Sequence, residues 1–138
     1  MPQLDVIHDA VKNALVNDGW KITHDPFTIQ YKGLKLYADL AAERAFTAVR
    51  DGQKIVVEVK SFVGLSKLHD LKIALGQYDI YISFLELLAP DHKLYVAISE
   101  KAYKNFFLRE AIQIVINRHR TPLIVVNLER EEIVKWIN

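Results

Sequence analysis

The sequence predicts a mixed α/β domain in which helices cover both faces of a mixed β-sheet. Apolar residues recur at helical spacing in some stretches and form short β-like runs in others. The chain has 138 residues, of which 51% are hydrophobic and 25% charged, as is ordinary for one domain with a buried core. We therefore expect a single domain over residues 1–138, with elements in the order αβββαβαβα.

The first half of the chain predicts a helix followed by an antiparallel meander. Residues 4–18 place apolar side chains on one helical face, and Gly19 stands where a helix commonly ends. Asp51 and Gly52 lie between two apolar runs and form a strong hairpin signal. The expected strands are residues 20–24, 27–31, 34–40, 46–50 and 54–62.

The second half predicts a long helix and then alternating strands and helices. Ser66 is a plausible N-cap for a helix that ends at Pro90. Its apolar residues extend around much of its circumference, which predicts burial on several sides. The remaining expected elements are a strand at 93–98, a helix capped by Ser99 that reaches about residue 118, a strand at 121–128 and a closing helix at 129–137.

Composition limits the setting and the chemistry. Without cysteine there are no disulfides or thiolate metal sites, so any metal is held by oxygen ligands or histidine. The net charge of +1 indicates no partner by itself, because domains that rely on neutralising phosphates usually carry a larger basic excess. A signal peptide and a long apolar segment are both missing, so we expect a soluble, cytoplasmic protein with no membrane partner.

One acid and one base stand out within the apolar run at residues 53–62. Glu58 and Lys60 are two residues apart, and alternation along a strand puts them on the same face. Burying a carboxylate and an ammonium on such a face is unfavourable unless they pair or hold something between them. This part of the chain is therefore the candidate site.

Asp39 lies upstream, at the end of another apolar run, and can meet Glu58 if the two strand ends converge. Two converged carboxylates beside a lysine suit a hard cation such as Mg²⁺, with Mn²⁺ as a substitute. The ion would acidify a bound water, and Lys60 would orient that water or stabilise developing charge. The hypothesis is phosphodiester hydrolysis with Asp39 and Glu58 as metal ligands. Glu43 could add a ligand or form a surface pair with Arg44.

Asp39 followed by Glu58-Val59-Lys60 after a hairpin resembles the PD-(D/E)xK motif of the restriction-endonuclease-like nuclease superfamily. The core of that superfamily is a helix, a three-stranded meander that carries the aspartate and the acid-x-lysine, a second helix and a further strand. The resemblance implies a restriction-endonuclease-like core and a metal-dependent endonuclease activity on DNA.

Two helices add candidate residues to the site. Gln77 and Tyr81 share a helix face and are similar to the Gln-x-x-x-Tyr signature of the branch related to RecB nucleases. The resemblance implies that Gln77 orients Lys60 or the nucleic-acid backbone, with Tyr81 supporting it. The first helix often carries a glutamate facing the metal in this superfamily, whereas this chain has His8 with Asp9 beside it. His8 is thus either a substrate-binding or supporting residue or an ordinary polar position.

At the level of the whole chain, the sequence resembles the XisH family, whose members are described as controlling factors for excision of the fdxN element. The resemblance implies a role in programmed DNA rearrangement and a companion factor, XisI. It is carried by residues 8–15, 18–26, 38–40, 58–62 and 76–78.

Two functions stay open on this basis. The first is a Mg²⁺-dependent DNA phosphodiesterase that uses Asp39, Glu58, Lys60 and Gln77. The second is an accessory module of recombination that binds DNA or XisI without cutting. The broadly apolar helix at residues 66–88 supports the second, because surplus apolar surface suits a partner or a second copy, and we expect a homodimer.

Overall fold

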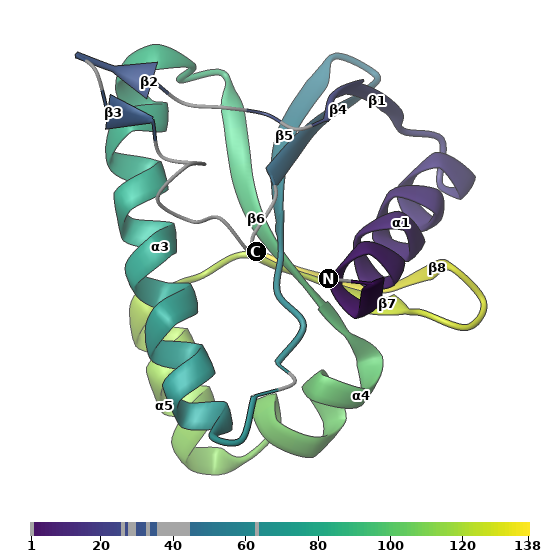
Figure 1. The fold of residues 1–138 in the computed structure, drawn as a ribbon, viewed down its shortest axis with the longest axis vertical. Coiled ribbons are helices and arrows are strands. Elements are labelled where there is room, and N and C mark those ends of the chain that lie inside the picture. Colours follow the sequence, from purple (N-terminus) through teal and green to yellow (C-terminus); the bar gives the residue numbers. More distant parts are fainter. Residues whose placement is uncertain (1, 26, 28–29, 33, 36–44, 63) are drawn as a thin grey trace.

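Six strands form one mixed sheet in the order β1-β4-β5-β6-β7-β8 (Figure 1). The computed structural model describes residues 2–25, 27, 30–32, 34–35, 45–62 and 64–138. Strands β5 to β7 are parallel to one another, and the remaining neighbours in the sheet are antiparallel. The strands are β1 Lys21–His24, β4 Ala45–Arg50, β5 Gln53–Val59, β6 His92–Ser99, β7 Leu123–Asn127 and β8 Glu132–Ile137.

Helices cover both faces of this sheet, as predicted (Figure 1). Helix α1 packs its apolar stripe, which includes Val11 and Leu15, against one face. Helices α3 and α5 cover the other face, where Ile112 and Ile116 of α5 join the core. The helical segments are α1 Pro2–Asn17, α3 Lys67–Leu88, α4 Glu100–Ala102, the π-helical segment η1 Tyr103–Phe107 and α5 Glu110–His119.

The hairpin between β4 and β5 is confirmed. Asp51 and Gly52 both have positive φ angles, 51° and 81°, as a tight two-residue hairpin turn requires. The turn fixes the register, in which Ala45 pairs with Glu58 at the far end of the ladder. Ala45, where β4 begins, therefore lies at the same end of the sheet as Glu58.

The predicted antiparallel meander is wrong about which strands pair with one another. Strands β2 (Gln30–Tyr31) and β3 (Leu34–Lys35) pair with each other as a separate two-stranded sheet. The place beside β4 is taken by β1, because Trp20 and Ile22 pack into the core that α1 covers. Among the described residues five strands precede α3, as the five predicted strand ranges require, whereas the order αβββαβαβα has three there and is not observed. Residues 36–44 lie outside the described residues.

The closing helix expected at residues 129–137 is a strand, β8. β8 pairs antiparallel with β7, and Glu131 makes the turn between them with a φ of 53°. Its β-branched and aromatic residues suit a pleated surface better than a short terminal helix. Trp136 in particular packs against Trp20, with ring centroids 5.6 Å apart. Pairing with β7 and this packing outweigh the local helical pattern.

The third helix is interrupted rather than continuous. Ser99 caps it as expected, since its Oγ accepts from the Ala102 N–H at 3.0 Å. Phe106 and Phe107 are then both buried against Phe62, although successive residues of an α-helix point in different directions. The wider turn of η1 accommodates both rings. The helical conformation is then interrupted at residues 108–109, and α5 begins at residue 110.

Helix α3 begins as predicted, with the Oγ of Ser66 accepting from the His69 N–H at 3.1 Å. The expectation of burial on several sides is wrong, because one face of the helix packs on the sheet and the other keeps large apolar side chains exposed. The buried residues are Leu71, Ala74, Tyr81 and Leu85. None of the helices in the described part of the chain is both long and apolar enough to cross a bilayer.

Candidate active site

Glu58 and Lys60, here called the acid–lysine pair, lie on the α3 face at the carboxyl end of β5. Val57 packs toward α1, whereas Val56 packs toward α3. Phe62, past the strand end, also packs on the α3 side. Residues two apart share a face, so the pair belongs to the same row as Val56 and Phe62. The prediction that both charges share one face agrees with this packing.

The acid–lysine pair is buried, which the sequence alone did not establish. Glu58 is 1% exposed and Lys60 is 4% exposed. The backbone N–H of Lys60 donates to the carbonyl of Ala97 at 3.0 Å, so the chain still follows β6 one residue past β5. The strand ends at Val59 rather than at residue 62, where Phe62 has a φ of 52°. Ionisable groups buried at the end of a strand are typical of a functional site.

Gln77 lies on α3, the helix that covers the sheet face of the acid–lysine pair. The first turns of α3 pack with Phe62, and the later turn that holds Tyr81 packs with Val56. Gln77 lies between these turns, on the side of the helix that also carries Tyr81. Its Oε1 atom is buried and has no hydrogen-bond partner among the described residues. The structure thus places Gln77 and Tyr81 on the helix that covers the face of the acid–lysine pair, and the predicted action of Gln77 on Lys60 stays a prediction.

His8 lies on the opposite face of the sheet. Its ring contacts that of Phe46 in the core under α1, with centroids 5.4 Å apart. Its Nε2 donates to the Oδ1 of Asp25 at 3.0 Å. The structure does not bring His8 onto the face that carries the acid–lysine pair, and its predicted role at the site stays a prediction.

Asp25 joins His8 and Lys12 in a small polar network at the edge of the α1 face. Burial opposes ionisation of Asp25, but hydrogen bonds from Lys12 and His8 and the charges of both outweigh that effect. Together they hold the pKa of the Asp25 carboxyl below its usual value. The network gives a buried histidine a partner and ties α1 to the end of β1.

The predicted ligands Asp39 and Glu43 lie outside the described residues. Asp39 precedes Ala45 by six residues in the sequence, and Ala45 pairs with Glu58. Within the part of the chain that the structure describes, no group of three or more histidine or acidic residues could hold a metal ion. Glu58 is the predicted metal ligand that the structure does place.

A groove of about 760 Å³, here called the carboxyl-end groove, lies at the ends of the parallel strands, and its lining includes Ser61, the residue after the acid–lysine pair. A polar residue from the end of each parallel strand lines it: Ser61 after β5, Ser99 of β6 and Asn127 of β7. Ligands of open α/β sheets bind outside the carboxyl ends of parallel strands. The sequence analysis missed this groove, although polar residues at three successive strand ends could have indicated it. Its basic residues are Lys67, Lys101 and Arg109, and its acids are Glu100 and Glu129.

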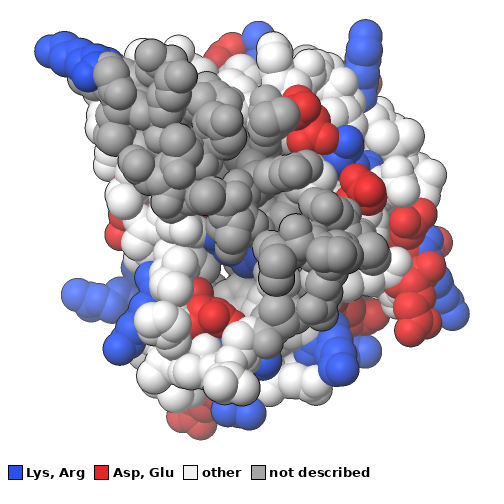
Figure 2. All heavy atoms as spheres, viewed as in Figure 1, with Lys and Arg blue, Asp and Glu red and all other residues white. Residues whose placement is uncertain are grey.

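Charge on the described surface is mixed in sign. Lysine and arginine side chains project around the rim of the face in Figure 2, with acidic side chains between them. This agrees with the formal net charge of +1. Any contact with a polyanion would therefore depend on local groups such as those of the carboxyl-end groove.

The fold and the site together define a mixed α/β domain with a buried acid–lysine pair at the carboxyl end of its parallel strands. The family model described as "XisH protein" matches residues 1–134. The chain belongs to the XisH family, which confirms the family resemblance seen in the sequence.

Two crystal structures are similar over nearly their whole length. One is of a fdxN element excision controlling factor protein from Anabaena variabilis, with 40% identity, a TM-score of 0.88, and coverage of 97% of this chain and 99% of that chain. The other is of an XisH family protein from Nostoc punctiforme, with 37% identity, a TM-score of 0.88, and coverage of 96% and 99%. The search of curated proteins gave no match.

Proposed function

We propose that this protein is a Mg²⁺-dependent DNA phosphodiesterase of the PD-(D/E)xK type that acts in the cytoplasm during excision of a DNA element. The observation that carries the proposal is the acid–lysine pair, buried at the carboxyl end of β5 on the sheet face that α3 covers. The similar protein from Anabaena variabilis is described as a fdxN element excision controlling factor, which supports the biological setting.

The residues at this end of the sheet fit a hard divalent cation. The Glu58 carboxylate is 1% exposed, and carboxylate oxygens are the ligands that such cations prefer. Asp39 would supply the second carboxylate, since its segment leads into β4 opposite Glu58. When bound, Mg²⁺ or Mn²⁺ would polarise a phosphoryl oxygen and lower the pKa of a water molecule.

The remaining residues of the chain would position the reacting groups. The Lys60 ammonium, on the same face as Glu58, would orient the attacking water or stabilise charge on the phosphate. Gln77 would hydrogen-bond Lys60 or the DNA backbone. Tyr81, through its packing on Val56, would hold α3 at a fixed distance from the sheet. The basic residues of the carboxyl-end groove would bind flanking phosphates of the DNA.

The test is cleavage of linear, supercoiled, single-stranded and branched DNA by the purified protein with Mg²⁺ or Mn²⁺. We expect nicking or cutting by the wild type and by Lys72→Ala, an exposed lysine of α3 that serves as the matched control. We expect none by Lys60→Ala, Glu58→Gln or Asp39→Asn. If the wild type binds these substrates and is as inactive as Lys60→Ala, the catalytic proposal is wrong.

The second candidate is an accessory factor that binds DNA or a partner without cutting, and the outer face of α3 favours it. Ile73, Ile80 and Leu87 follow one another at seven-residue spacing, so they share a face, and they are 42%, 45% and 68% exposed. Exposed apolar stripes of this kind mark interaction sites. The proposed partner is a second copy of the chain or a companion of the XisI type.

Light scattering of the purified protein distinguishes these partners. A homodimer that Ile80→Glu dissociates, while Lys72→Glu on the same helix leaves it intact, would place the dimer interface on this stripe. A wild-type monomer that binds an XisI-type companion only when Ile80 is intact would assign the stripe to that companion. A monomer that binds neither would rule out this use of α3.

A further inference from the structure

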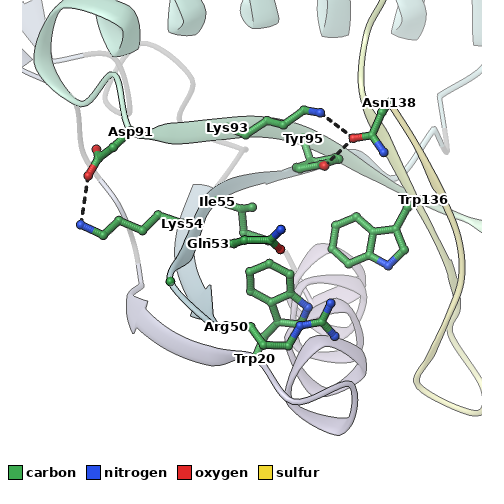
Figure 3. A pocket seen from close by; sticks show the side chains of 11 residues that line it. Trp20, Arg50, Gln53, Lys54, Ile55, Asp91, Lys93, Tyr95, Trp136 and Asn138 are labelled. Atoms are coloured by element: carbon green, nitrogen blue, oxygen red, sulfur yellow. Dashed lines mark hydrogen bonds and ion pairs between the residues drawn. The ribbon is translucent and has the colours of Figure 1, made fainter.

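A second pocket lies at the other end of the sheet from the acid–lysine pair (Figure 3). It has a volume of about 570 Å³, which is in the range of sites for small ligands. It is formed where β5 and β6 begin and where β4 and β8 end. The residues that line it include Trp20, Arg50, Lys54, Lys93, Tyr95 and Trp136.

Three aromatic rings form one wall of this pocket. The centroids of Trp20 and Trp136 are 5.6 Å apart, and those of Tyr95 and Trp136 are 5.1 Å apart. Trp20 is 4% exposed, and its indole N–H is buried without a hydrogen-bond partner among the described residues. Tyr95 is 7% exposed, whereas Trp136 is partly exposed. The wall thus offers the Trp136 ring as flat apolar surface, with the other two rings packed behind it.

Basic side chains surround the aromatic wall. The Arg50 guanidinium lies 4.8 Å from the Trp20 ring centroid, and the Lys93 ammonium lies 5.2 Å from that of Tyr95. Lys54 also lines the pocket, and the acid among the described lining residues is Asp91, which Lys54 contacts at 3.0 Å. Arg50 in turn contacts Asp18, which lies outside the lining, at 2.9 Å. Among the described residues, three cations against two carboxylates leave one positive charge in excess, which attracts an anion.

Neutral polar groups complete the lining. Asn138 Oδ1 accepts from the Tyr95 hydroxyl at 2.6 Å and from the Lys93 ammonium at 2.5 Å, which holds the lysine against the aromatic wall (Figure 3). Gln53 adds a second carboxamide. Carboxamides both donate and accept, as the edges of nucleobases do.

We propose that this pocket binds a phosphorylated nucleotide unit, with the base against the aromatic wall and the phosphate among Arg50, Lys54 and Lys93. Base stacking on aromatic side chains combined with cations for the phosphate is the common chemistry of nucleotide and single-strand binding. The source of the unit is either a free mononucleotide or the 5′-phosphorylated end of a single strand. The site is at the opposite end of β5 from the proposed catalytic residues, so it does not depend on DNA cleavage.

The tryptophans provide a direct readout. The chain contains two tryptophans, Trp20 and Trp136, and both line the pocket. Titration with adenosine monophosphate should change their fluorescence in a saturable way, and calorimetry should give the same affinity. Adenosine and inorganic phosphate, each lacking half of the ligand, should bind at least about tenfold more weakly.

Variants and oligonucleotides complete the experiment. Lys93→Ala and Lys54→Ala, both at exposed positions, should keep the wild-type melting temperature and each lose about tenfold in affinity, whereas Lys72→Ala should lose none. A 5′-phosphorylated oligothymidine that binds more tightly than the mononucleotide would identify a strand end, and the reverse order a free nucleotide. No binding by any of these ligands, equal binding of inorganic phosphate, or unchanged binding by Lys93→Ala would overturn the proposal.

Discussion

The two faces of strand β5 differ in what they hold. Toward α1 the strand presents Ile55, Val57 and Val59, which belong to an apolar core. Toward α3 it presents Val56 and Glu58, with Lys60 one residue past the strand end, and both residues of the acid–lysine pair are buried just as deeply. The same strand thus supplies apolar packing on one face and a buried acid on the other.

This difference indicates how the chain separates stability from function. The α1 face is closed by a helix whose contacts with the sheet are apolar, and its His8 has Asp25 as a partner. The α3 face instead buries two ionisable residues at the carboxyl end of the parallel strands, the end of such sheets at which ligands bind. Substitutions on the first face should reduce stability, and those on the second should reduce activity.

The largest expected effect is on the stability of the α1 face. Phe46→Ala removes a fully buried ring from this core and should lower the free energy of unfolding by about 3–5 kcal/mol. Val134→Ala, at an exposed position of β8, should change it by less than about 0.5 kcal/mol. Urea denaturation measures both. If Phe46→Ala lowers the free energy of unfolding by less than about 1 kcal/mol, the α1 face is not the main source of stability.

The next effect is on activity and concerns the α3 face. Lys60→Met keeps the length of the side chain but removes its charge, and should reduce DNA cleavage by at least about 100-fold. Its free energy of unfolding should fall by less than that of Phe46→Ala, because no apolar ring is lost. A gel-based cleavage assay and a denaturation curve on the same preparation give both numbers. Cleavage at the wild-type rate would contradict the assigned role of Lys60.

A smaller effect is expected for the polar network of the α1 face. Asp25→Asn should lower the free energy of unfolding by roughly 1–2 kcal/mol at neutral pH, because it removes charge-assisted bonds to His8 and Lys12. The pKa of Asp25 is lowered in the folded protein, so this stabilisation is present above its ordinary pKa of about 4 and is lost as the pH falls through the folded value.

The difference between wild type and Asp25→Asn should therefore shrink below about pH 4, as measured by urea unfolding at several pH values. Asp9→Asn, at an exposed position of α1, is the matched control and should show no such trend. A difference that stays constant down to acid pH would mean that the charge of Asp25 is not what stabilises the network.

The smallest effect concerns the start of α3, the helix that covers the acid–lysine pair. Ser66→Ala removes the N-cap and should lower the free energy of unfolding by about 1 kcal/mol without changing DNA cleavage. Ser83→Ala is the control, since the Ser83 hydroxyl bonds a carbonyl one turn back within the helix and caps nothing. Equal thermal stability of Ser66→Ala and wild type would show that the cap is not needed.

Local signals explain the parts of the fold that the sequence predicted. Helical periodicity located α1 and α3, and Asp51 with Gly52 located the hairpin. The helix predicted at residues 129–137 was wrong because Ile133, Trp136 and Ile137 also have helical spacing. Their pairing with β7 is a long-range effect that the local pattern does not contain.

The sequence also predicted only part of the candidate site. Alternation along one strand was enough to put Glu58 and Lys60 on one face, and four-residue spacing was enough to pair Gln77 with Tyr81. The depth of burial and the carboxyl-end groove depend on where other strands end, so they required the structure. The aromatic pocket was not predictable, because Trp20, Tyr95 and Trp136 come together from three separate parts of the chain.

The most direct test of the central claim is a crystal of the protein soaked in Mn²⁺, with the ion located by its anomalous scattering. We expect one ion bound by the carboxylates of Asp39 and Glu58, next to Lys60, and loss of that ion in Glu58→Gln. Absence of any ion between these carboxylates at saturating Mn²⁺ would contradict a metal-dependent phosphodiesterase.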